Sequence, residues 1–301
     1  MSRPVRAEAR RPSRIVVAAV AIAVLVTGCA PAPALTPQSL DPFRGDDGLL
    51  HDRDVVGIAG DALPEGSTVE GLATTAAALR LLQTSGFEPQ LTASEEAALD
   101  RAAADATAGD ADPDALVGAA RVCALATRTS PACSGAREAA AALLDRPADE
   151  LTTGGEPVAV IDTAADLGLR EAASGGLLAE ALASAEPCVD SAVVRYRARI
   201  DAPLDPALVP DPRERTQKVL SALRDGDIDR ALCLSGVVAA TAGATPERDE
   251  DWLQGPFDEA VAAGFERSAD GLYAALDRRR GRIETTRMLS QVSFDLSVEL
   301  R

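Results

Sequence analysis

Two aspartates in one predicted helix have the spacing that best fits catalysis. Asp162 and Asp166 are four positions apart in a segment that opens at Pro157, so they share one face of a helix. A pair of carboxylates can act as general acid and base, as in glycoside hydrolases. A solvated acidic helix face explains the same spacing equally well. Asp162 and Asp166 are therefore candidates for an acidic site, with that alternative open.

Three aspartates at alternate positions have the spacing that opens an EF-hand calcium loop. They are Asp225, Asp227 and Asp229. The sixth position of such a loop is glycine and the twelfth is glutamate, but here these positions hold Arg230 and Gly236. A capped helix start therefore explains the three aspartates better than a calcium site.

Several other kinds of site are disfavoured by the residues present. His51 is the only histidine, so a zinc site with two histidines cannot form. No Gly-x-Ser-x-Gly, Ser-x-x-Lys or Walker-type phosphate motif occurs. The formal net charge of −17 argues against nucleic-acid binding, which requires a basic surface. We therefore expect no catalytic residue set of a known pattern, no metal, no cofactor and no nucleic-acid partner.

One basic cluster stands out in this acidic chain. It consists of Arg278, Arg279, Arg280 and Arg282. Arginines of this kind often lie at a helix C-terminus, where they interact favourably with the helix dipole, and we expect that here. Contact with lipid headgroups or with an acidic partner is the alternative.

The first 28 residues have the pattern of an export signal. Residues 1–14 contain five arginines and one glutamate, and residues 15–26 are apolar throughout. This run is shorter than the about 20 residues that a transmembrane helix needs, so it is interpreted as a signal peptide. It ends in Val26-Thr27-Gly28-Cys29, which resembles the lipobox of bacterial lipoproteins. In that family the cysteine thiol receives a diacylglyceryl group, and cleavage leaves the cysteine as the first residue.

The resemblance implies a lipid anchor at Cys29 and an extracytoplasmic location at the cell membrane. Two or more acyl chains hold a protein stably on a membrane. Four prolines in residues 30–47 disfavour a helix and indicate a flexible tether. We expect a signal peptide at 1–28, a lipidated tether at 29–50 and a folded domain at 51–301. An ordinary signal peptide with a chance cysteine is the alternative.

The other four of the five cysteines indicate disulfides. They are Cys123, Cys133, Cys188 and Cys233. An even number in an exported domain favours two disulfides, and four cysteines allow three connectivities. Because Cys123 and Cys133 flank a turn segment, we predict the pairs Cys123–Cys133 and Cys188–Cys233. Buried free thiols are the alternative, and a four-cysteine zinc site is disfavoured because no Cys-x-x-Cys pair occurs.

Helix signals recur along the folded domain, and strand signals do not. Capping boxes begin at Ser67 and Thr92, and Asp112-Pro113 and Ser130-Pro131 pair an N-cap with a proline at the first helical position. Apolar residues then recur at the helical period. The pattern predicts an all-α fold of about twelve helices in stacked hairpins.

Particular boundaries and a repeat also follow from this pattern. A helix is predicted from Ser268 through Leu276, and another from Thr245 with an interruption at Gly255-Pro256. Three prolines in residues 201–210 indicate a linker. The more apolar helices, near residues 74, 119, 163, 191, 235 and 286, recur about every 45 residues, as in a helix-pair repeat. We expect these helices on the inside and their polar partners outside.

The segment Gly71–Pro89 resembles the repeats of terpenoid-cyclase and prenyltransferase proteins of the α/α-toroid class. The resemblance implies six inner and six outer helices; an open superhelix or an irregular bundle is the alternative. The Asp-x-Asp-Asp motif of the class II cyclases is absent. His51 precedes the first helix, so the zinc site of the protein prenyltransferases cannot be built from matching positions. The resemblance thus implies the scaffold without its catalytic residues.

These observations favour a membrane-anchored, extracytoplasmic lipoprotein without catalytic activity. It would bind a small-molecule ligand or an envelope protein through a concave helical surface. One alternative is an α/α-toroid enzyme that acts on isoprenoid lipid or glycan. Another is a structural partner in a secretion or cell-wall assembly.

Overall fold

The computed structural model describes residues 35–89, 91–108, 112–146, 156–170, 176–186, 188–200, 202, 212–242, 251–276 and 280–301. The predicted all-α class is confirmed: within this part of the chain, helices dominate and the one sheet has two short strands. The elements are η1 (Pro37–Phe43), α1 (Thr68–Thr84), α2 (Ala93–Thr107), α3 (Pro113–Leu125), α4 (Pro131–Leu144), α5 (Pro157–Leu167), α6 (Leu177–Ala183), α7 (Val189–Arg199), α8 (Pro212–Arg224), α9 (Ile228–Ala242), α10 (Asp251–Gly264), β1 (Phe265–Arg267), β2 (Tyr273–Ala275) and α11 (Arg282–Leu296). No helix in these ranges is both long enough and apolar enough to cross a membrane.

The predicted N-caps explain where the first four α-helices begin. The side chains of Ser67, Thr92, Asp112 and Ser130 each accept a hydrogen bond from a backbone N–H in the first turn of the helix that follows. These bonds satisfy donors that have no partner within the helix itself. At α2 the full capping box forms with Glu95.

The helix predicted from Ser268 to Leu276 is wrong. Strands β1 and β2 form an antiparallel hairpin there, with Phe265 opposite Ala275. The connecting turn is fixed by local bonds: Gly271 has a φ of 85°, and the Ser268 hydroxyl donates to the Leu272 carbonyl at 2.7 Å. A positive φ cannot continue a right-handed helix, so the turn overrides the helical spacing of the apolar residues.

The predicted interruption of α10 is also wrong. The helix runs through Pro256 without a break, although proline removes one backbone donor. Phe257, Ala260 and Val261 are buried along the same face, and their burial stabilises the continuous helix. The predicted start at Thr245 and most of the predicted linker 201–210 lie outside the described residues.

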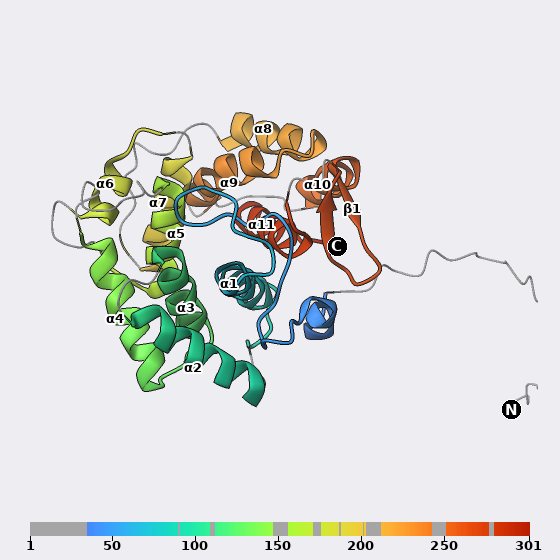
Figure 1. Ribbon diagram of the computed structural model, residues 1–301. Coiled ribbons are helices and arrows are strands. Elements are labelled where there is room, and N and C mark those ends of the chain that lie inside the picture. The colour runs from blue at the N-terminus through green and yellow to red at the C-terminus, as the bar shows by residue number, and fades with distance from the viewer. Residues whose placement is uncertain are drawn as a thin grey trace, which may run out of the picture. The chain divides into compact units, whose positions relative to one another are not determined.

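Six helices contact one another in a cyclic order. Helix α1 contacts α3, and the contacts continue through α5, α7, α9 and α11 back to α1. These six are the helices predicted as the more apolar, inner set. Figure 1 shows α1 and α11 near the middle of the view, with the other helices around them. Helices α2 and α4 pack against α3, α6 against α5, and α8 against α9.

Small residues set the close spacing of the inner helices. Ala119, Ala120 and Ala164 are fully buried. A Cβ added at Gly118 on α3 would lie 2.9 Å from the Leu72 Cβ on α1, so the glycine is required by the close approach of these two helices. The larger apolar side chains, such as Leu72 and Ile161, fill the remaining space, and each contributes about 1.5–3 kcal/mol by its burial.

The folded body begins earlier than predicted. Residues 35–50 belong to the predicted flexible tether, but η1 lies within them, and Leu40, Leu49 and Leu50 are buried. Leu40 and Leu50 pack with apolar residues of α1, including Leu81. The prolines were misleading because Pro37 opens the 3₁₀ helix and Pro42 lies inside it. Residues 1–34 lie outside the described part of the chain.

Both predicted disulfides are confirmed. Cys123 at the end of α3 pairs with Cys133 at the start of α4, with their Cα atoms 5.4 Å apart. Cys188, just before α7, pairs with Cys233 on α9, with a Cα separation of 4.5 Å. The first bond fastens one helix hairpin, and the second connects two neighbouring inner helices.

The two disulfides are expected to stabilise the fold unequally. They close loops of different length, since their sequence separations are 10 and 45 residues. The chain-entropy relation gives a stabilisation of about 2.8 kcal/mol for the shorter loop and about 4 kcal/mol for the longer one. We predict that the double variant Cys188→Ala/Cys233→Ala is less stable to denaturant than Cys123→Ala/Cys133→Ala by about 1 kcal/mol. The opposite order of unfolding free energies would contradict this account.

Candidate functional site

Residues 44–66, which we call the strap, join the beginnings of four inner helices. The Asp52 carboxylate accepts the Ile283 N–H of α11 at 2.7 Å. The Ile58 N–H donates to Asp114 in the first turn of α3 at 2.6 Å, and the Ile58 carbonyl accepts the N–H of Glu156, the N-cap of α5, at 2.9 Å. Figure 1 shows this segment in blue, crossing from α1 and α11 toward α5. The N-terminal ends of these four helices therefore all lie beside the strap.

His51 fastens the strap to α1 through two carboxylates. Its Nδ1 lies 2.5 Å from Glu70 Oε2, and its Nε2 lies 3.1 Å from Asp47. An imidazole can donate from both nitrogens only when it is protonated, so this arrangement holds His51 as the cation. Glu70 is buried and also accepts the Asp52 N–H at 2.8 Å and the Thr74 hydroxyl at 2.7 Å. His51, the single histidine of the sequence, thus has a structural role: its ion pairs hold the strap against α1.

The pKa of His51 is raised by its two partners. Partial burial alone would lower the pKa, but the hydrogen bonds and charges of Glu70 and Asp47 outweigh it. A group whose pKa is raised in the folded state stabilises the fold below its unfolded pKa. That stabilisation is lost as the pH rises through the folded pKa.

Asp52 closes the first turn of α11. Its carboxylate accepts the backbone N–H groups of Ile283 and Arg53, at 2.7 and 2.9 Å. Burial raises the pKa of Asp52 to about 6, although these hydrogen bonds and the charge of Arg282 act in the opposite direction. The carboxyl therefore titrates near neutral pH in a position where it caps a helix.

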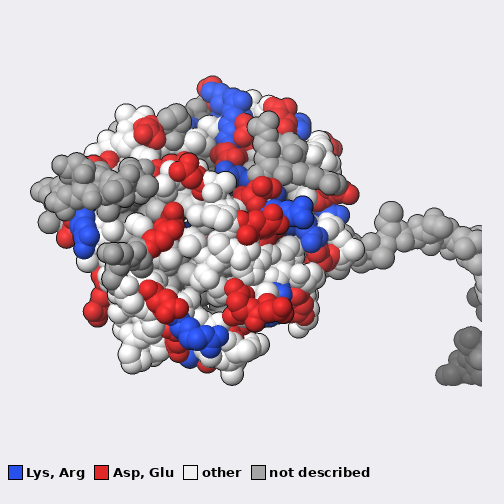
Figure 2. Space-filling model, in the orientation of Figure 1, with Lys and Arg blue, Asp and Glu red and all other residues white. Residues whose placement is uncertain are grey.

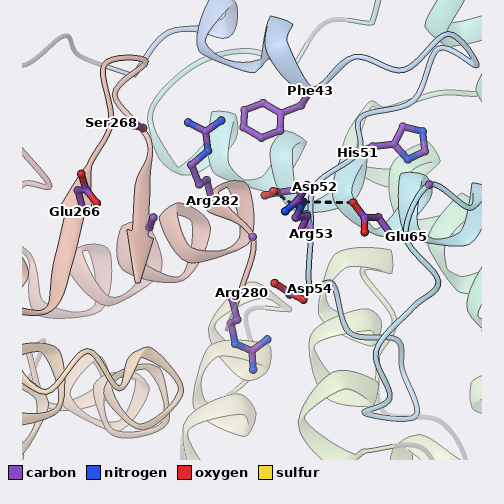
Figure 3. A pocket seen from close by; sticks show the side chains of 13 residues that line it. Phe43, His51, Asp52, Arg53, Asp54, Glu65, Glu266, Ser268, Arg280 and Arg282 are labelled. Atoms are coloured by element: carbon purple, nitrogen blue, oxygen red, sulfur yellow. Dashed lines mark hydrogen bonds and ion pairs between the residues drawn. The ribbon is translucent and has the colours of Figure 1, made fainter. Parts of the chain in front are cut away.

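A cavity of about 630 Å³ lies between the strap, the β-hairpin and the start of α11. Figure 3 shows the Arg282 guanidinium beside the ring of Phe43, with 4.8 Å between the guanidinium carbon and the ring centroid. Arg282 also pairs with Asp270 at 2.8 Å. Arg53 lies 3.3 Å from Glu65, as the dashed line in Figure 3 marks. The cavity is lined by Phe43, His51, Asp52, Arg53, Asp54, Glu65, Gly66, Glu266, Ser268, Ala274, Arg280, Gly281 and Arg282. Its lining combines both signs of charge with one aromatic ring, which suits a polar ligand.

The prediction that the basic cluster lies at a helix C-terminus is wrong for its two described arginines. Arg282 is the first residue of α11, and Arg280 precedes the helix, so neither lies at a helix C-terminus. A cation at a helix N-terminus is unfavourable, and the carboxylates of Asp52 and Asp270 offset it. Arg280 pairs with Asp229 at 2.5 Å, which ties α11 to α9. Arg278 and Arg279 lie outside the described residues.

Asp166 is not part of a solvated acidic face. Its side chain is 2% exposed and is held by three guanidiniums from three other inner helices. Arg121 of α3 donates to Oδ2 from Nε and Nη2, at 2.9 and 2.7 Å. Arg199 of α7 donates to Oδ1 at 2.9 Å, and Arg80 of α1 donates to the same oxygen. We call these four residues the Asp166 cluster.

The Asp166 cluster does not form the acid–base pair considered above. Burial would raise the pKa of Asp166, but the charges of Arg121, Arg80 and Arg199 hold it well below its usual range. An ionised carboxylate bound to three guanidiniums is neither a proton donor nor an accessible nucleophile near neutral pH. Asp162, one turn earlier on α5, is half-buried and not among the hydrogen-bonded partners of the cluster.

Further ion pairs continue through the inner helices. On α11, Arg287 forms two hydrogen bonds with Glu284, at 2.9 and 2.8 Å. Arg195 of α7 pairs with Asp295 of α11 at 3.3 Å, and both are buried. Arg195 and Asp295 are 100 positions apart, so helical periodicity alone gives no signal of their pairing, whereas Glu284 and Arg287 are three positions apart on one helix.

The aspartates of the supposed calcium loop serve other purposes. Asp227 precedes α9 and accepts the Arg230 N–H at 3.0 Å, as a helix cap does. Asp229 pairs with Arg280. The sequence interpretation of a capped helix start is confirmed.

Acidic side chains surround a largely uncharged centre on the face of the molecule that Figure 2 presents. This distribution agrees with the formal charge of −17.

Comparison with protein-family models, with curated proteins and with solved structures finds no match to the chain.

Neutralising Asp166 is expected to destabilise the protein strongly. In the variant Asp166→Asn the three guanidiniums lose their shared anion, and removal of one partner from a buried ion pair costs about 3–5 kcal/mol. The matched control is Glu138→Gln, which removes an exposed carboxylate on α4 and should change the unfolding free energy by about 0.5 kcal/mol or less. Denaturant unfolding of both variants measures the difference, and equal stabilities would contradict the structural role assigned to Asp166.

The contribution of His51 is expected to depend on pH. The variant His51→Gln has no charge at this position at any pH. The difference in unfolding free energy between the wild type and the variant should therefore be largest below 6.5, the unfolded pKa of histidine. The difference should shrink as the pH rises above 6.5 and through the raised pKa of folded His51, because His51 then loses its proton in the folded state. A difference that is constant with pH would argue against a charged His51.

Proposed function

We propose that this chain is an extracytoplasmic lipoprotein that is anchored by lipid at Cys29 and acts by binding a ligand or a protein partner. The observation that carries the proposal is the pairing of the cysteines. The four cysteines of the body form two disulfides, and this leaves Cys29 as the fifth. Stable disulfides are typical of proteins outside the cytosol, which supports export.

The position of Cys29 supports lipidation in particular. It follows a basic segment, an apolar run and two small residues, as in a lipobox. The described body begins at residue 35, so only a few residues separate the proposed anchor from η1. Such a short connection would hold the body close to the membrane surface, where its acidic character would repel anionic lipid.

The cavity beneath the strap is our candidate for the binding site. Several of its charged groups already have structural partners: His51 with Glu70 and Asp47, Arg282 with Asp270, and Arg280 with Asp229. These pairs fix the positions of the side chains, which favours selective binding of a polar ligand. Because these groups are already held in ion pairs, they are poorly suited to act as a catalytic acid or base, and this supports binding over catalysis.

An enzyme built on an α/α toroid is the second candidate function. The cyclic contacts of the six inner helices support a toroid scaffold. A carboxyl with a pKa raised to about 6, Asp52, lines the cavity, and such a group suits general acid–base chemistry on isoprenoid lipid or glycan. Against this reading, Asp52 accepts two backbone N–H groups at the start of α11, and that structural role explains its position.

Labelling of the protein with palmitate is expected to require the thiol of Cys29. When the full chain is expressed in a bacterium that processes lipoproteins and is fed radiolabelled palmitate, the wild type should be labelled and membrane-bound. Cys29→Ala should lose the label completely, because the four remaining cysteines form disulfides.

The matched control is Ala30→Ser, which keeps the thiol and changes only its neighbour. This variant should retain the label and remain with the membrane. Full labelling of Cys29→Ala would contradict the proposed anchor, as would an unmodified, uncleaved N-terminus in the mass spectrum of the wild type.

A further inference from the structure

The Asp166 cluster contains more positive charge than its carboxylate neutralises. Three guanidiniums surround one carboxylate, which leaves a surplus of two positive charges. The neighbouring pair of Glu284 and Arg287 is neutral in itself. The charge of Asp162, one turn away on α5, reduces the surplus to one. The region therefore keeps a net positive charge inside a protein of net charge −17.

The cluster also contains unused hydrogen-bond donors. Each guanidinium carries five N–H groups. The Asp166 carboxylate accepts four hydrogen bonds from the three guanidiniums together. Arg121 Nη1 and Arg199 Nη2 form no hydrogen bond within the described part of the chain. Arg80 Nε is buried without a hydrogen-bond partner. An unmet buried donor is costly, and this applies to Arg80 Nε. The remaining donors of Arg121 and Arg199 are on side chains that solvent reaches, so a bound anion can accept hydrogen bonds from them in place of water.

Solvent reaches the arginines but not the carboxylate. The side chains of Arg80, Arg121 and Arg199 are 16%, 24% and 23% exposed, against 2% for Asp166. All four residues lie within the last five residues of their helices, whereas the strap contacts the first turns. The accessible surface of the cluster is therefore distinct from the cavity beneath the strap.

We propose that the Asp166 cluster binds a small oxyanion, a phosphate or a carboxylate group, through Arg121 and Arg199. The planar guanidinium matches two oxygens of either group, and its bonds to an anion are charge-assisted. Asp166 positions the guanidiniums and prevents their mutual repulsion from separating them. The repulsion is apparent at Arg199, whose pKa is lowered by burial and by the charges of Arg80 and Arg195, against the effect of Asp166.

Isothermal titration calorimetry of the wild-type protein tests the proposal. Inorganic phosphate and succinate are titrated separately, at constant ionic strength in chloride. We expect saturable binding of at least one probe at one site per chain, and the tighter probe identifies the class of anion. The absence of saturable binding of both probes at millimolar concentrations would overturn the proposal.

Three variants then locate the site. Arg121→Gln should weaken binding about tenfold or more, because it removes one charge-assisted contact. Asp162→Asn should tighten binding several-fold, because it removes a nearby negative charge from a half-buried position. Arg101→Gln, an exposed arginine on α2, should leave the affinity unchanged.

The opposite directions expected for Arg121→Gln and Asp162→Asn separate the anion site from a purely structural cluster. If Arg121→Gln fails to fold, the tightening in Asp162→Asn still decides the question. Binding that is equal in the wild type and in Asp162→Asn would place the anion elsewhere and overturn the proposal.

Discussion

The bonds that converge on Asp166 are the constraint on which the arrangement of the inner helices depends. One buried carboxylate on α5 holds guanidiniums from α1, α3 and α7, so it connects four of the six helices that contact in a cycle. The desolvation of these charges is costly, and only the close geometry of all four groups offsets it. The apolar contacts alone are made largely by alanine and leucine, which pack in many similar ways. We expect the ion cluster to select one register of the helices.

The two ends of the inner helices are organised by different means. At their beginnings, the strap provides carboxylates and backbone groups to the first turns, where unpaired N–H donors and the helix dipoles favour acceptors. Near their ends, arginines gather where the dipoles favour cations. The result is a polar cavity beneath the strap and a separate, positively charged cluster at Asp166. A binding function fits this division, since each region has fixed charges and its own access to solvent.

Local sequence rules predicted the local features well. N-caps at Ser67, Thr92 and Asp112 set the starts of α1, α2 and α3, and the spacing of the cysteines predicted both disulfides. The hairpin at 265–275 escaped prediction because the turn at Gly271 decides it, and the apolar spacing there also fits a helix. The site residues were predictable only in part. Asp166 was singled out, but its role depends on arginines 45 and 86 positions away, and the partner of Asp52 lies 231 positions along the chain.

Hydrogen exchange of backbone amides in Asp166→Asn tests most directly whether one carboxylate holds four helices together. If the account is correct, amides of α1, α3, α5 and α7 lose protection together, because the loss of the shared anion releases all four. Amides of α10, which packs against α8 and β1 and has no residue in the cluster, should lose less protection than amides of these four helices. Loss of protection confined to α5 would contradict the account, since Asp166 would then stabilise only its own helix.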